Sequence, residues 1–153
     1  MSDLPCIKDI IERDGEYIGT PHGDSMWPLL HNKRDTIHVV KKTDKLNKHD
    51  VALYIRKNGQ YVLHRIMKIE NNSYTMCGDS QYVLEKGIQE DQIIGVLKSF
   101  YRNDRFCDTN KIRYKIYVFI WCLSPKIRRF LMRFVAYAEN KKNKIKSRGK
   151  AKR

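Results

Sequence analysis

Short runs of β-branched or alternating apolar residues, separated by turns, recur through residues 16–101 and predict short β-strands. Asn58-Gly59 and Asn71-Asn72 interrupt this pattern, and the first pair is a strong signal for a two-residue hairpin. Short strands joined by tight turns predict a mainly β fold with antiparallel pairing, open or partly closed. The β-branched or alternating runs occupy residues 36–40, 51–56, 61–69, 73–76 and 93–100.

Helical spacing replaces alternation before this region. Apolar residues recur at helical spacing among charged ones as far as Gly15, a residue typical of a helix end. We therefore expect a short amphipathic helix within residues 1–15 and a β domain over residues 16–110. The apolar positions of the helix are Leu4, Ile7, Ile10 and Ile11.

Residues 111–139 are expected to form an apolar strand followed by an amphipathic helix. The apolar run at residues 116–123 is too short to span a bilayer, which needs about 20 residues. Ser124 and Pro125 suit the cap and first turn of the helix that follows. Its apolar positions are Ile127, Phe130, Leu131, Phe134, Val135 and Ala138, and its cations are Lys126, Arg128, Arg129 and Arg133.

The formal net charge of +14 is confined to the C-terminal stretch. Residues 111–153 hold 15 Lys and Arg against one acid, Glu139, whereas residues 1–110 hold 16 of each sign. We expect residues 140–153 to be a basic disordered tail. The basic amphipathic helix and this tail predict an anionic membrane surface as partner of residues 125–153. Packing of the helix on the β domain is the alternative. Nucleic acid is disfavoured as a partner because aromatics do not interleave with the tail's charges.

The four cysteines provide neither a metal site nor an expected disulfide framework. No C-x-x-C pair occurs, and no histidine lies at ligand spacing from a cysteine, so no zinc or other cofactor is expected. A chain with this much apolar residue does not require disulfide cross-links, which favours reduced thiols. Cys77 is expected to be a packed, inert thiol.

The stretch HGDSMWPLL at residues 22–30 contains the main candidate for chemistry, Ser25. Gly23 and Pro28 form a sharp corner that can present one hydroxyl with neighbouring N–H groups turned outward. Turn chemistry alone also explains every residue of this stretch. Met26 and Trp27 suit either a core anchor or the wall of a substrate pocket, and the sequence does not choose between these roles.

Two further short motifs follow the Ser25 motif along the chain. YVLHRIMKI at residues 61–69 is a strand with a His-Arg pair, and TMCGDS at residues 75–80 contains a Gly-Asp turn. Together with the Ser25 box they resemble the Ser-His branch of the signal peptidase I superfamily. This resemblance covers roughly residues 19–102 and implies the coiled antiparallel β fold shared by signal peptidases and LexA-type repressors.

The resemblance implies a serine endopeptidase with a Ser-His dyad that cleaves a peptide or precursor protein. Ser25 is the nucleophile, and His64 is the general base because a neutral imidazole accepts a proton near neutral pH. Asp79 is expected to orient His64, and Glu85 matches the position of a second acid in the family. His22 is the rival base.

Two alternatives remain open. A non-catalytic peptide-binding or membrane adaptor with the same fold would tolerate replacement of Ser25. A Ser-Lys dyad is disfavoured because Lys57 and Lys68 do not occupy the strand position of His64.

The expected location follows from the two ends of the chain. Residues 1–15 lack the basic start and unbroken apolar region of a signal peptide, and also the membrane-spanning helix with which signal peptidases usually begin. We therefore expect a cytoplasmic enzyme, peripheral at the inner face of the membrane. The alternative is a membrane protein in which residues 112–135 span and the catalytic domain lies outside, which the Lys and Arg residues after Pro125 disfavour.

Overall fold

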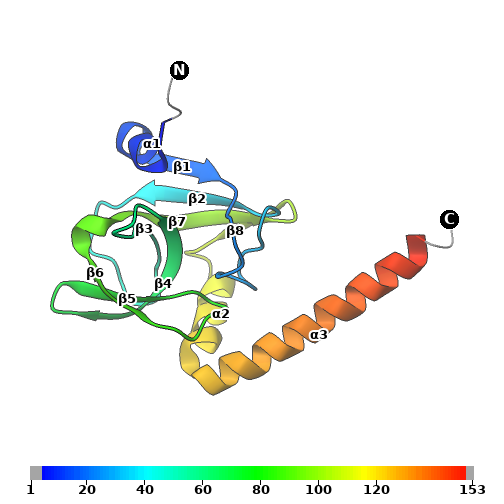
Figure 1. Cartoon of the computed structure of the whole chain (residues 1–153). Coiled ribbons are helices and arrows are strands. Elements are labelled where there is room, and N and C mark those ends of the chain that lie inside the picture. Colours follow the sequence, from blue (N-terminus) through cyan, green and yellow to red (C-terminus); the bar gives the residue numbers. More distant parts are fainter. Residues whose placement is uncertain (1–4, 151–153) are drawn as a thin grey trace.

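A computed structural model describes residues 5–150, without the side chains of residue 125 and residues 142–150 (Figure 1). The helices are α1 (Ile7–Asp14), a single 3-10 turn η1 (Glu90–Gln92), α2 (Ile112–Leu123) and α3 (Pro125–Lys150). The strands are β1 (Glu16–Gly19), β2 (Thr36–Lys41), β3 (Val51–Ile55), β4 (Tyr61–Glu70), β5 (Ser73–Cys77), β6 (Glu85–Gln89), β7 (Ile93–Arg102) and β8 (Arg105–Asp108).

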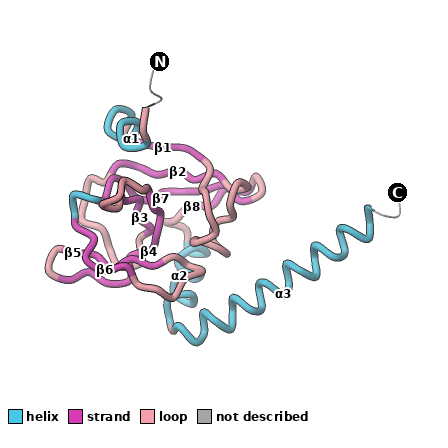
Figure 2. Tube along the Cα trace, viewed as in Figure 1, coloured by secondary structure: helices cyan, strands magenta, loops and turns pink. Residues whose placement is uncertain are grey.

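The eight strands form one sheet in which every pairing is antiparallel. Their order is β1-β2-β7-β3-β4-β5-β6, and β8 adds to β7. Figure 2 shows the strands curving into one body, from which α3 extends. The prediction of a mainly β, antiparallel fold is confirmed.

Alternation along β3 divides the core between the two faces of the curved sheet. Val51 and Leu53 belong to one apolar cluster, which also holds Leu29 and Leu30 from the Ser25 loop. Ala52 and Tyr54 belong to a second cluster. Because β3 is buried on both faces, it fixes the position of its hairpin partner β4, which carries His64.

The N-terminal helix and the hairpin are confirmed at the positions predicted. Gly15 ends α1 in the left-handed conformation, with φ 78°, and its N–H donates to the Ile11 carbonyl at 3.0 Å. Gly59, with φ 82°, lies in the turn that joins β3 to β4. Leu4 lies outside the described residues.

Three strands and one helix differ from the sequence prediction. Strands β1, β6 and β8 were not among the predicted runs, because each has only four or five residues and few of its side chains are buried. Residues 116–123 belong to the helix α2, where we expected a strand. The apolar residues of this run do not alternate with polar ones, so periodicity does not separate strand from helix there.

The C-terminal stretch forms two helices and not one. Ser124 has extended angles, φ −159° and ψ 141°, because the following proline disfavours helical geometry at this position. The single helix over residues 112–135 required by the spanning alternative is therefore not formed. In the described residues, no helix combines the length and apolar character needed to cross a bilayer. Helix α3 continues through Lys150, where we expected disorder from residue 140, and residues 151–153 lie outside the described part.

Candidate active site

Ser25 lies in a tight turn between β1 and β2. The Trp27 N–H donates to the Asp24 carbonyl at 3.0 Å and closes the turn. Leu29 and Leu30, each 2 % exposed, anchor the end of the loop in the core. The double leucine of the sequence motif therefore fixes a loop that leaves Ser25 half-buried.

A second loop, at residues 78–80, supports the Ser25 backbone from the other side. The Ser25 carbonyl accepts hydrogen bonds from the Ser80 N–H at 2.9 Å and from the Ser80 hydroxyl at 3.0 Å. A side chain at Gly78 would place its Cβ 2.5 Å from the same carbonyl oxygen. Glycine is therefore required at this position by the close approach of two backbones.

Ser25 and His64 line the same pocket, which has a volume of about 470 Å³. Other walls come from α1, β1, β3 and the β3–β4 hairpin. In the described part of the chain, the Ser25 hydroxyl forms no hydrogen bond, either with His64 or with another residue. A serine hydroxyl without a competing partner is free to approach an imidazole in the same pocket, and hydrogen bonds between such groups are often long in free proteins.

Tyr54 and Glu85 hold the His64 ring. The Tyr54 hydroxyl oxygen lies 3.2 Å from His64 Nδ1, and the same hydroxyl donates to Glu85 Oε2 at 2.7 Å. Since the only hydroxyl proton of Tyr54 goes to Glu85, the Tyr54 oxygen must accept a proton from Nδ1. This arrangement leaves Nε2 unprotonated, which is the tautomer that a general base requires.

Burial and a neighbouring cation keep His64 neutral. Together, burial and the nearby Arg56 guanidinium lower the pKa of His64 to about 4, against the opposing effect of the Glu85 and Asp79 carboxylates. Arg56 also donates to both Glu85 oxygens, which holds the pKa of Glu85 below its ordinary value and keeps it a charged acceptor. His64 is therefore a neutral, oriented imidazole at neutral pH.

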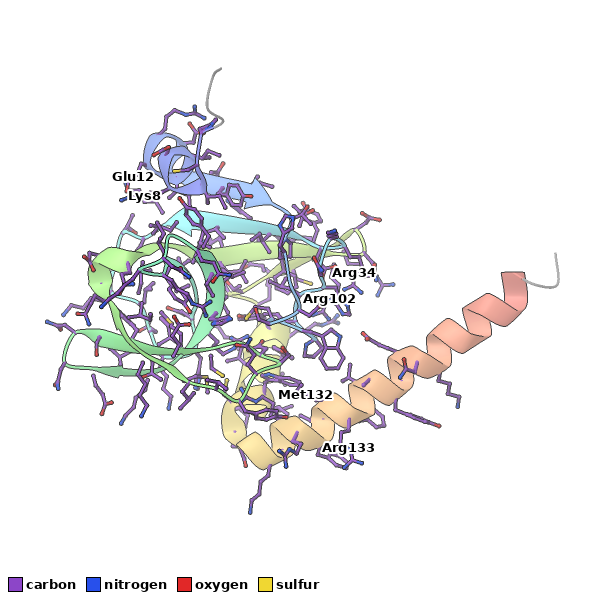
Figure 3. The ribbon with its side chains drawn as sticks, in the orientation of Figure 1. Lys8, Glu12, Arg34, Arg102, Met132 and Arg133 are labelled. Carbon is purple, nitrogen blue, oxygen red and sulfur yellow. The ribbon has the colours of Figure 1, made fainter. Side chains whose placement is uncertain are left out.

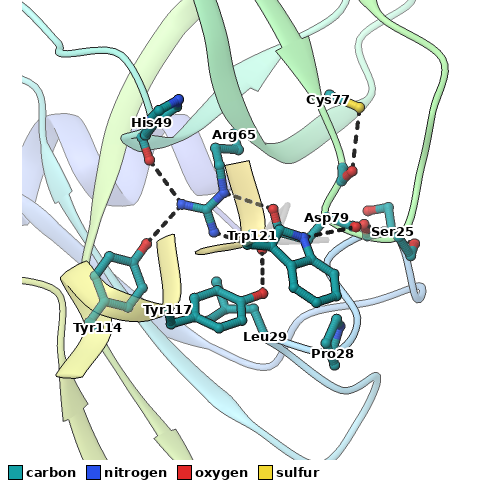
Figure 4. A network of polar contacts seen from close by, with 12 residues as sticks. Ser25, Pro28, Leu29, His49, Arg65, Cys77, Asp79, Tyr114, Tyr117 and Trp121 are labelled. Atoms are coloured by element: carbon teal, nitrogen blue, oxygen red, sulfur yellow. Dashed lines mark hydrogen bonds and ion pairs between the residues drawn. The ribbon is translucent and has the colours of Figure 1, made fainter. Parts of the chain in front are cut away.

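Asp79 does not take the role that we expected from the sequence. Its two carboxylate oxygens accept hydrogen bonds from Arg65 Nε and Nη2, both at 2.7 Å (Figure 4). Among the described residues, Asp79 forms no hydrogen bond with His64. Arg65 follows His64 in β4 and points to the opposite face, so Asp79 lies on the far side of the strand from the base. A guanidinium donates two parallel hydrogen bonds to a carboxylate, whereas an imidazole N–H donates only one, so Asp79 is better paired with Arg65 than with His64.

Helix α2 covers the ion pair between Arg65 and Asp79. The Tyr117 hydroxyl donates to Asp79 Oδ2 at 3.0 Å, and Trp121 Nε1 donates to the Asp79 carbonyl at 3.2 Å. Arg65 also donates to the Tyr114 hydroxyl at 3.2 Å. Both charged side chains are 1 % exposed. The ion pair therefore holds the loop at residues 78–80, strand β4 and helix α2 together.

The remaining candidate residues divide between the pocket and its surroundings. Met26 is buried and lines the pocket with Ser25, so it contributes to both the core and the wall. Trp27 is not part of the pocket: its Nε1 donates to Glu139 of α3 at 3.3 Å, and its ring meets His31 edge to face. His22, the rival base, is exposed and also lines the pocket.

A second Ser-His-acid arrangement occurs elsewhere in the sheet. His38 Nδ1 lies 3.2 Å from the Ser99 hydroxyl, and His38 Nε2 lies 2.7 Å from Glu16 Oε2. Ser99 is 5 % exposed and sits between β2 and β8, each of which pairs with it. A substrate carbonyl cannot reach this oxygen, so these contacts are structural.

The sequence analysis missed Tyr54 and Arg56. The Asn58-Gly59 hairpin supplies the signal that was available, because the observed register pairs Tyr54 with Val62 and Ala52 with His64. Tyr54 and His64 are therefore diagonal neighbours on one face, within reach of each other's long side chains. Tyr54 was not singled out because an aromatic residue in a predicted core strand is ordinarily expected to pack and not to act through its hydroxyl.

All four cysteines are free thiols, and burial raises the pKa of Cys77. No group of three or more His, Cys, Asp and Glu side chains in the described residues forms a metal-binding cluster. Comparison of the chain with protein-family models, curated proteins and solved structures finds no match.

Proposed function

We propose that the protein is a serine endopeptidase of the signal-peptidase-like kind, with Ser25 as nucleophile and His64 as general base. One observation carries the proposal: Ser25 and the oriented, neutral His64 line a single pocket. The ordered sequence boxes support the finer fold assignment, the coiled β fold of signal peptidases and LexA-type repressors.

Acylation uses groups that are present in the pocket. His64 Nε2 takes the Ser25 hydroxyl proton as the oxygen forms a bond to the scissile carbonyl carbon. The tetrahedral intermediate then collapses, the carbon–nitrogen bond breaks, and the same proton passes from His64 to the leaving amine. A water molecule releases the acyl group from Ser25 by the reverse sequence of proton transfers.

Backbone donors for the developing oxyanion are available at the nucleophile itself. The N–H groups of Ser25 and Met26 have no hydrogen-bond acceptor among the described residues. The turn fixes both groups before substrate arrives, so they stabilise negative charge without reorganisation.

Glu85 takes the place of Asp79 in this proposal. Glu85 acts on His64 through the Tyr54 hydroxyl, and its negative charge favours the imidazolium that forms during acylation. Asp79 anchors the loop at residues 78–80 through Arg65 and holds α2 through Tyr117 and Trp121, and among the described residues it forms no hydrogen bond with Ser25 or His64.

The non-catalytic adaptor is the second candidate. The observation that favours it is the missing hydrogen bond between the Ser25 hydroxyl and His64. An adaptor would bind peptide in the same pocket and leave it intact.

Cleavage of a peptide mixture followed by mass spectrometry separates these candidates. Wild type is expected to generate new termini that Ser25→Ala does not generate. Ser99→Ala is the matched control, because Ser99 also contacts a histidine but lies outside the pocket. Peptide binding without any Ser25-dependent cleavage would support the adaptor.

A further inference from the structure

Helix α3 has two different long faces. Arg128, Leu131, Val135 and Glu139 lie toward the domain: Arg128 is buried and donates to the Gln81 carbonyl at 2.7 Å, and the others line a pocket with α2 and the Ser25 loop. Figure 3 shows the division, with Met132 toward the domain and Arg133 away from it. The apolar face predicted from the sequence is therefore partly used for packing, as the alternative prediction required.

The outward face of α3 remains unpartnered and is both aromatic and basic. Phe130, Phe134 and Tyr137 are 70 %, 63 % and 66 % exposed. They share a surface groove with three cations, none of which forms an ion pair in the described part of the chain: Lys126, Arg129 and Arg133. The single acid of this region, Glu139, lies on the other face with His31 and Trp27.

An exposed apolar loop continues this face toward the pocket. Tyr82, Val83 and Leu84 are 45 %, 81 % and 47 % exposed. The Arg129 guanidinium lies 5.5 Å from the centre of the Tyr82 ring, which joins the loop to the outward face. The preceding residue, Gln81, lines the pocket of Ser25 and His64.

We propose that an anionic lipid bilayer docks on the outward face of α3 and on the loop at residues 82–84. Bulky aromatics insert at the level of the headgroups, and interleaved cations meet lipid phosphates. The charge agrees with this partner, because residues 141–153 add eight Lys and Arg and no acid. Phe130 and Phe134 alternate with cations around a helix, which suits insertion into a bilayer, whereas nucleic-acid phosphates require no exposed apolar face.

Docking in this way places the mouth of the Ser25–His64 pocket beside the bilayer. If the proposed peptidase function is correct, its substrates are segments that emerge from or lie along an anionic membrane. The docking itself rests on surface residues and does not depend on catalysis, so the two proposals fail separately.

Vesicle co-sedimentation of the full chain tests the docking. The vesicles are phosphatidylcholine with and without about 30 % phosphatidylglycerol. We expect binding to the anionic vesicles only, and about tenfold weaker binding for the double variant Phe130→Ser/Phe134→Ser. Phe106→Ser is the matched control, because Phe106 is 59 % exposed on β8 and lies far along the chain from this face. It should bind like wild type, as should Ser25→Ala.

Charge and loop variants complete the test. Arg129→Gln/Arg133→Gln is expected to weaken binding to anionic vesicles several-fold, while the exposed Arg105→Gln is not. Val83→Ser should weaken it without changing the circular dichroism spectrum. Binding by wild type that none of these variants weakens, or tighter binding to duplex DNA than to the anionic vesicles, would overturn the proposal.

Discussion

Tyr54 stands between His64 and Glu85, 3.2 Å from the Nδ1 atom of the histidine and 2.7 Å from an oxygen of the glutamate. A tyrosine hydroxyl thus separates the histidine from the carboxylate, whereas the histidine and acid of a Ser-His-Asp triad are in direct contact. Through this hydroxyl, Glu85 orients the His64 ring and polarises it with its negative charge. The same hydroxyl fixes the tautomer of His64.

Tyr54→Phe is expected to lower kcat by about tenfold to a hundredfold, with a small change in KM. The variant leaves His64 Nδ1 without its acceptor, so the ring loses the constraint that holds Nε2 unprotonated. Steady-state kinetics on a cleaved peptide measure the effect. Tyr74→Phe is the matched control, because Tyr74 is also a buried tyrosine that donates to a glutamate, Glu90. Equal losses in the two variants would contradict a positioning role for Tyr54.

The pH dependence of kcat/KM should report the low pKa of His64. The pKa of about 4 means that His64 is neutral above this pH and gains a proton below it. Protonation of Nε2 removes the base, so activity is expected to stay level between about pH 6 and 8 and to fall as the pH drops toward 4.

Arg56→Gln should move this acid limb to higher pH. Arg56 lowers the pKa of His64, so its removal lets the histidine gain a proton earlier as the pH falls. An acid limb that stays in place in Arg56→Gln would indicate that another group controls the profile.

Removal of Asp79 is expected to affect stability first. Asp79→Asn leaves Arg65 charged, buried and without its partner, which costs about 3–5 kcal/mol of the free energy of unfolding. Urea denaturation measures this loss. Arg65→Met/Asp79→Leu removes both charges and should recover a large part of it. A stable Asp79→Asn variant with a strong loss of kcat would return Asp79 to the role of His64 partner.

Helix α2 is expected to be part of the folded domain. Trp121 is 3 % exposed and contacts Asp79. Replacing it with Ala should lower the free energy of unfolding by about 3–5 kcal/mol. Phe119→Ala, two residues away and 66 % exposed, should change the free energy of unfolding by less than about 0.5 kcal/mol. Similar small effects of both would show that α2 does not support the domain.

Local signals in the sequence were sufficient for much of the fold. Gly15 and Asn58-Gly59 mark a helix end and a hairpin because their conformations depend on single residues. Strand β4 was predictable because a run rich in apolar residues follows the hairpin turn directly.

The sequence did not show which of two similar side chains contacts a residue far away along the chain. Asp79 had two basic candidates on adjacent positions of β4, and the tertiary fold, with α2 packed above Arg65, pairs it with the arginine. Arg128, a cation in an apparently exposed helix, is 6 % exposed because α3 crosses the loop at residues 81–82. Alternation along a strand predicts which face of the sheet a side chain occupies, but which residue it contacts on that face depends on the tertiary fold.

The central claim is that Ser25 is a nucleophile activated by His64, and its most direct test is covalent labelling. Intact mass is measured after the protein reacts with a serine-directed acylating probe, with and without lipid vesicles. We predict one adduct on wild type and on Ser99→Ala, none on Ser25→Ala, and much slower labelling of His64→Ala. A folded wild type that gains no adduct, or one whose adduct survives Ser25→Ala, would contradict the claim.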